Sequence, residues 1–216
     1  MPLQNRVTPC GEIIAIEQRG LFMGNRGIIH DPATRTLLTR RWTNPAWIIC
    51  RCDFRGVRRQ VMARRSWTEL FFLDEATALS AGHRPCYYCR REAALAFADA
   101  WARAHRVAHV SATQIDTRLH AERLKKGAKR IHQLHGTPAN LPDGAMVSWS
   151  GEAYLIVGGL ARRWGVSGYE EPRRLARADG LLTPPSTVAT LRAGFACVLH
   201  PSASDVTDRR PPSHCL

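Results

Sequence analysis

Two closely spaced cysteines near the middle of the chain constrain its fold more than any other feature. Cys86 and Cys89 form a Cys-x-x-Cys pair within residues 81–91, directly before a strong helix pattern. Two thiolates at this spacing are typical of half of a tetrahedral zinc site, and a structural zinc needs four ligands. The helix N-terminus that follows favours thiolate over thiol. The pair therefore predicts half of a Zn²⁺ site.

A second cysteine pair supplies the other half. Cys50 and Cys52 lie in an apolar stretch that reads as a β-strand. Residues i and i+2 of a strand point to the same face, so both sulfur atoms could reach one ion. The predicted metal ligands are therefore Cys50, Cys52, Cys86 and Cys89. Two alternatives remain open: the upstream pair is ordinary buried strand, or His83 replaces one of its thiols.

The charge of the chain indicates a polyanionic partner. The 31 lysines and arginines exceed the 18 acidic residues and give a formal net charge of +13. Nucleic acid is favoured over a membrane as the partner, because no apolar run approaches the ~20 residues of a spanning helix. Of the two nucleic acids, DNA is favoured over RNA. Residues 1–6 lack the apolar core of a signal peptide, and seven cysteines suit a reducing compartment, so we expect a cytoplasmic protein. The alternative is an arginine-rich composition spread over a solvated surface.

Basic side chains gather around the cysteine pair and at the end of the second helix pattern. In such positions they are typical of contacts to phosphates. The predicted nucleic-acid-binding residues are Arg84, Arg90, Arg91, Lys125, Lys126, Lys129 and Arg130.

Residues 76–89, an alanine-rich helix followed by Gly-His-Arg-Pro-Cys-x-x-Cys, resemble a known family. About residues 74–92 are similar to the zinc-binding domain of Ada-type DNA methylphosphotriester repair proteins. The resemblance implies that Cys86 and Cys89 are two of four zinc ligands in a small α+β unit that contacts DNA. The upstream pair departs from the family, because one residue separates Cys50 from Cys52 where the family has three. Methyl-acceptor activity is therefore not carried over.

One segment also suggests catalysis. His120-Ala121-Glu122 matches the His-x-Glu half of the zinc-deaminase signature, and Pro85 to Cys89 matches its Pro-Cys-x-x-Cys half. The two halves occur in reverse order, so this function requires a permuted deaminase. A second catalytic hypothesis is a metal-dependent nuclease that uses His120 and Glu122, with Asp116 one turn earlier. The third possibility is an interaction protein whose zinc is purely structural.

The element pattern predicts an α+β protein. We expect a zinc-stabilised, basic N-terminal module with two following helices (residues 1–136), a small β-rich domain (137–200) and a disordered tail (201–216). Residues 47–54 and 57–62 read as a hairpin, residues 23–27 as a glycine-rich turn, and residues 90–105 and 112–126 as helices. Residues 146–149 and 153–157 form a second predicted hairpin, and residues 195–199 a last strand.

Overall fold

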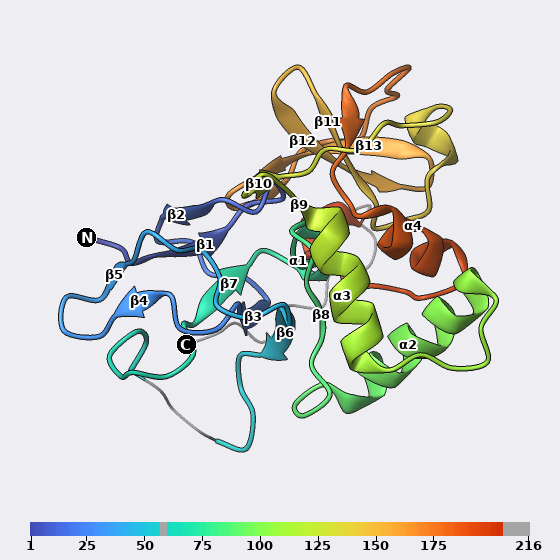
Figure 1. The fold of residues 1–216 in the computed structure, drawn as a ribbon. Helices are drawn as coiled ribbons and strands as arrows, with labels where there is room; N and C mark the ends of the chain where they lie inside the picture. The colour runs from blue at the N-terminus through green and yellow to red at the C-terminus, as the bar shows by residue number, and fades with distance from the viewer. Residues whose placement is uncertain (57–59, 205–216) are drawn as a thin grey trace.

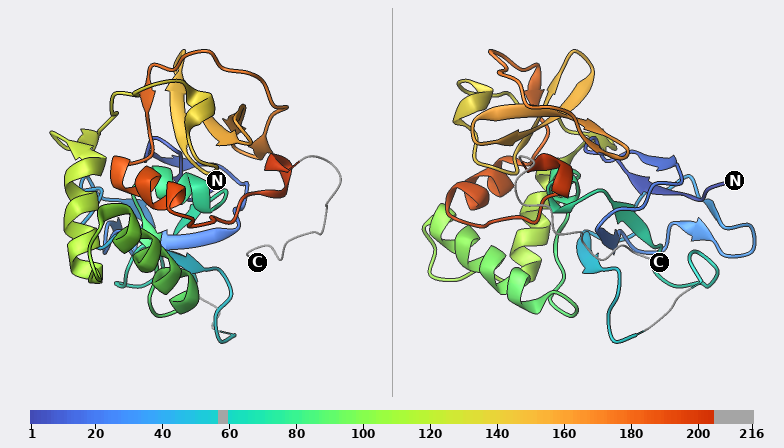
Figure 2. Two further views of the ribbon diagram at one scale, coloured as in Figure 1. Left: turned by 90° about the vertical axis from the view of Figure 1, so that its right-hand side faces the viewer. Right: turned by 180° about the vertical axis from the view of Figure 1, so that it is seen from behind.

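The chain folds into a mixed α+β structure, which confirms the predicted fold class. A computed structural model describes residues 1–56 and 60–204. Two larger β-sheets and the helices α1 to α4 form the fold, with two short hairpins at its periphery. Figures 1 and 2 show the two sheets at different ends of the molecule, with α2, α3 and α4 gathered on one side.

The N-terminal half forms a six-stranded sheet. Its order is β2 (Ile13–Ala15), β1 (Gln4–Val7), β7 (Leu70–Phe72), β3 (Phe22–Asn25), β6 (Ile48–Arg51) and β8 (Arg84–Pro85). Gly24 in β3 is required by packing, since a Cβ there would lie 2.0 Å from the Ile48 carbonyl oxygen. The glycine-rich segment that the sequence suggested as a turn is thus largely a central strand, whose glycine allows close approach of β6.

The C-terminal half forms a five-stranded sheet. Its order is β14 (Gly168–Tyr169), β13 (Leu160–Gly165), β12 (Glu152–Val157), β11 (Met146–Trp149) and β15 (Gly180–Leu181). The β11–β12 hairpin is confirmed, and Ser150 and Gly151 at its tip both have positive φ. Two left-handed residues make the tight turn that matches strand twist.

Within residues 1–56 and 60–204, four helices connect and cover these sheets. They are α1 (Glu75–Ser80), α2 (Arg91–His105), α3 (Ala112–Arg123) and α4 (Pro185–Arg192). Every residue of α1 is buried, and Figure 1 places it between the two sheets. Asp74 caps α1, since its carboxylate accepts hydrogen bonds from the Thr77 amide and hydroxyl, both at 2.8 Å.

One hydrophobic cluster includes side chains from both halves of the chain. It contains Ile49 and Phe72 of the six-stranded sheet, Phe97 of α2, and Tyr154 and Leu181 of the five-stranded sheet. The boundary at residues 136/137 stays a prediction, but the apolar side chains on its two sides pack together.

The second predicted helix ends earlier than expected. Lys126 and Gly127 both have positive φ and form the tip of a hairpin made of β9 (Leu124–Lys125) and β10 (Ala128–Lys129). Left-handed residues cannot continue a right-handed helix, so α3 ends at Arg123. The other short hairpin pairs β4 (His30–Asp31) with β5 (Thr36–Leu37).

Three further expectations differ from the structure. Strand β6 pairs with β3 and β8, and not with the predicted strand at 57–62, of which residues 57–59 lie outside the described part. Residues 195–199 form no strand. A 3-10 turn, Pro201–Ala203, begins the segment predicted as a disordered tail, and residues 205–216 of that tail lie outside the described part. The other 3-10 turn is Pro138–Asn140.

Candidate metal centre and basic surface

A short parallel pairing brings the two cysteine segments together. In β6 and β8, Ile48 lies opposite Arg84 and Ile49 opposite Pro85. The amide of Cys86 donates a hydrogen bond to the Ile49 carbonyl at 2.9 Å. Cys86 is thereby fixed beside Cys50, although 35 residues separate the two positions in the chain.

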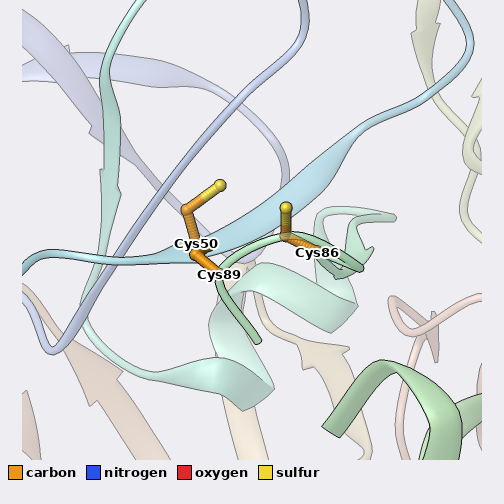
Figure 3. A group of neighbouring side chains, drawn as sticks. All are labelled: Cys50, Cys86 and Cys89. Atoms are coloured by element: carbon orange, nitrogen blue, oxygen red, sulfur yellow. The ribbon is translucent and has the colours of Figure 1, made fainter. Parts of the chain in front are cut away.

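Three sulfur atoms meet at this place. The Sγ atoms of Cys50, Cys86 and Cys89 all lie within 4.8 Å of one another. Figure 3 shows Cys50 on its strand and Cys86 and Cys89 on the facing loop. Cys50 and Cys86 are buried, and Cys89 is half-buried. This group could hold a metal ion, which confirms the predicted metal site in its coarse form.

Hydrogen bonds to sulfur favour an anionic cluster. The Tyr88 amide lies 3.4 Å from Cys86 Sγ and donates a hydrogen bond to it. Contacts with the thiols of Cys50 and Cys89 lower the pKa of Cys86, whereas the same Cys86 contact raises the pKa of Cys50. The cluster therefore holds one thiolate readily, and a bound cation would displace the remaining protons.

Two other predicted ligands are placed differently. Cys52 follows the end of β6 and is not part of the three-sulfur group; its Sγ lies 3.6 Å from the Leu21 carbonyl oxygen. Cys52 is disulfide-bonded in the structure, so it could act as a fourth ligand only after reduction, and this role stays a prediction. His83 is fully buried, with Nδ1 3.2 Å from the Ala78 carbonyl oxygen and Nε2 accepting from Arg26 Nε at 3.2 Å. Both ring nitrogens of His83 are thus engaged outside the cysteine group.

The predicted phosphate-contacting residues divide into internal and exposed ones. Arg84 is buried and makes a two-pronged ion pair with Asp116, with N–O distances of 2.8 and 2.7 Å. Arg90 pairs at 2.6 Å with the buried Glu75. Arg84 thus connects the Cys-x-x-Cys loop to α3, and Arg90 connects it to α1. Both guanidinium charges are paired with carboxylates inside the fold.

Lys129 is also directed inward. Its ammonium group donates a hydrogen bond to the Ser80 carbonyl, and burial lowers its pKa to about 7. The remaining predicted residues are exposed: Arg91, Lys125, Lys126 and Arg130. Three of these lie on or beside the β9–β10 hairpin, which therefore forms a basic edge, here called the hairpin edge (residues 125–130).

The structure does not bring His120 and Glu122 together as a catalytic pair. Glu122 is buried, and its carboxylate accepts hydrogen bonds from the amide and hydroxyl of Ser186 at 3.0 and 2.7 Å. His120 lies near Arg123, with a distance of 3.1 Å between Nδ1 and the guanidinium. Within the described part of the chain, no metal-ligand group includes either residue. The pair is two residues apart on a helix, so its side chains point in different directions.

One further arrangement of side chains has no signal in the sequence. The guanidinium groups of Arg26 and Arg123 each lie 4.1 Å from the ring centroid of Trp47. Beyond Arg123, the ring of His120 contacts the ring of Trp42. These five residues are here called the cation–aromatic column. They come from three distant segments, and no local spacing connects them.

Comparison with protein-family models, with curated proteins and with solved structures gives no match to this chain. Among the helices of the described residues, none has the length and apolar character needed to cross a membrane.

Proposed function

We propose that the protein binds Zn²⁺ through Cys50, Cys86 and Cys89 and uses its basic surface to bind nucleic acid, DNA in preference to RNA. The convergence of Cys50 with the Cys-x-x-Cys pair is the observation that carries this proposal. Thiolates are soft ligands that suit zinc. A zinc ion bound by distant segments would also cross-link β6, the Cys-x-x-Cys loop and the start of α2. A solvent molecule would take the fourth position, or Cys52 once its disulfide is reduced. A cytoplasmic location is part of the proposal, because thiolates stay available in a reducing compartment.

The proposal of nucleic-acid binding rests on exposed basic side chains. Lys125, Lys126 and Arg130 are exposed on the hairpin edge, and residues 123–130 include no acidic residue. Such a surface would contact phosphates, which position a protein without reading bases. A role in DNA repair or processing is proposed from the resemblance of residues 74–92 to the Ada-type zinc domain. The catalytic alternatives lack support from geometry, since Glu122 is engaged with Ser186 and Arg118.

Metal content of purified variants tests the zinc site. Wild type should contain one zinc per chain by elemental analysis. Replacement by serine of Cys50, Cys86 or Cys89 should each remove most of it, whereas Cys10→Ser, a free cysteine outside the group, should retain it. Cys52→Ser decides the fourth ligand: it loses zinc if Cys52 coordinates. Wild type without zinc would contradict the proposal.

Salt titration of binding tests the second part with the same zinc-loaded protein. Affinity for duplex DNA should fall with salt, and each phosphate contact contributes about −0.9 to the log–log slope. Replacing Lys125, Lys126 and Arg130 by glutamine should make the slope shallower by roughly 2 to 3. Arg174→Gln with Arg177→Gln, two exposed arginines near the other sheet, is the matched control. If the affinity of wild type for DNA did not depend on salt, the remaining hypothesis would be an interaction protein whose zinc is purely structural.

A further inference from the structure

The cation–aromatic column runs from the interior of the protein to its surface. Trp47 is buried, and the guanidinium groups of Arg26 and Arg123 each lie 4.1 Å from its ring centroid. Arg123 then contacts His120 Nδ1, and the His120 ring meets the Trp42 ring edge-on, with centroids 4.7 Å apart and an interplanar angle of 75°. Trp42 is the exposed end of the column, with 39% of its surface accessible.

The outer end of the column is held by the interior. Because a guanidinium can only donate, Nδ1 of His120 accepts from Arg123, and in the neutral ring the proton sits on Nε2. The backbone around Trp42 is fixed too. The Thr43 amide donates to the Arg26 carbonyl at 2.9 Å, and the Ile28 amide donates to the Thr43 hydroxyl at 3.1 Å. The exposed indole is therefore presented in one orientation before any ligand arrives.

The surroundings of Trp42 carry positive charge. Residues 39–47 include Arg40 and Arg41 and no acidic residue, and both arginines are exposed. The hairpin edge follows α3 within ten residues of His120 and is also free of acidic residues. An exposed aromatic ring bordered by basic side chains is complementary to a nucleobase bordered by phosphates. A neutral apolar partner would gain nothing from the arginines.

We propose that Trp42, supported by His120, is a stacking platform for an unpaired nucleobase, so that the preferred partner is single-stranded nucleic acid. In a duplex the faces of the bases are covered by their neighbours, and a surface ring can stack only on a base that is unstacked. This inference rests on the proposed nucleic-acid binding and adds the strand form to it.

Anisotropy titrations with a labelled single strand, and with the duplex made from it, test the platform. Trp42→Ala should weaken single-strand binding roughly ten-fold, as expected for one lost stacked base, and leave duplex binding within about two-fold. Trp42→Phe keeps an aromatic face and should retain most of the affinity. Val166→Ala, an exposed apolar residue with 37% accessible surface near the other sheet, is the control and should change neither.

Intrinsic fluorescence provides a second readout that needs no alanine variant. Stacking should quench the Trp42 emission, so wild type should show more quenching by the single strand than Trp42→Phe does. Equal effects of Trp42→Ala on both strand forms, or quenching unchanged in Trp42→Phe, would overturn the platform while nucleic-acid binding survives. Absence of binding to either form by wild type would instead defeat the proposed function itself.

Discussion

At the scale of single residues, the interior of this protein holds cations without carboxylate partners. Arg26, Arg123 and Lys129 form no ion pair within the described residues, and backbone carbonyls and histidine ring nitrogens accept their hydrogen bonds instead. Gly11 accepts from Arg26 at 3.0 Å and Gly82 from Arg123 at 2.7 Å. Carbonyl dipoles offset only part of the cost of removing a charge from water. Among the three, lysine is the residue that can give up its proton.

Lys129 should make the stability of the protein depend on pH. Burial lowers its folded pKa to about 7 from 10.5. Between these values the unfolded chain binds more protons, so the free energy of unfolding should rise with pH. Urea unfolding of Lys129→Met between pH 7 and 9 should show a slope shallower than wild type by up to about 1.4 kcal/mol per pH unit. Lys125→Met, the exposed neighbour, should keep the wild-type slope; identical slopes for all three would contradict the buried ammonium.

Which charged residues are buried could not be predicted from the sequence. The Cys-x-x-Cys pair is recognisable in the sequence because its ligand spacing is local. The sequence predicts that Arg84 and Lys129 contact phosphates. Inside the fold, Arg84 instead pairs with Asp116, and Lys129 donates a hydrogen bond to the Ser80 carbonyl. Their partners lie 32 and 49 residues away in the chain. Only the tertiary structure decides whether such side chains face water.

At the scale of elements, α3 connects two other parts of the fold through polar contacts at its two ends. Near the beginning of α3, Asp116 forms an ion pair with Arg84. Near the end of α3, Glu122 accepts a hydrogen bond from the amide of Ser186, in the first turn of α4. A carboxylate at a helix N-terminus satisfies amides that have no partner within the helix and interacts favourably with the helix dipole. Glu122 therefore has a structural task that accounts for its burial.

Replacement of Glu122 should lower stability. Glu122→Ala would leave the Ser186 amide and hydroxyl unpaired in a buried place, so we expect the free energy of unfolding to fall by about 2 kcal/mol or more. Glu122→Gln keeps an acceptor and should cost about half as much. Denaturant unfolding measures both values, with Glu171→Ala, an exposed glutamate outside the helices, as the control near zero. Unchanged stability of Glu122→Ala, combined with a lost activity, would return Glu122 to the catalytic hypotheses.

Elements formed by local signals were the predictable ones. The alanine-rich helix patterns predict α1 and α2, and the two short strand patterns on either side of residues 150–152 predict the β11–β12 hairpin. The partners of β6 were not predictable, because β3 and β8 lie on opposite sides of it in sequence and the assumed neighbour at 57–62 was simply the next apolar run. The same non-local pairing with β8 is what completes the three-sulfur group.

At the scale of the whole molecule, the two sheets share their apolar interior. The main hydrophobic cluster runs from Val7 and Phe72 through Phe97 to Val147 and Leu191. Asp74 links the halves by polar contacts as well, since it accepts from the Tyr169 hydroxyl at 2.9 Å and from the His200 amide at 3.1 Å. The sequence analysis predicts a separate domain from residue 137, but the order of elements along the chain does not reveal where side chains pack.

The shared interior predicts that residues 1–136 do not fold alone. Separation at this boundary would expose Phe72 and Phe97, which are about 1% accessible in the full chain, and would leave Asp74 without two of its donors. The isolated segment should therefore bind a hydrophobic dye and unfold without a cooperative transition, even with zinc added. The full chain should unfold in one transition that moves to lower temperature when a chelator removes the metal. A cooperative transition of the segment at the midpoint of the full chain would instead establish two independent domains, as the sequence first indicated.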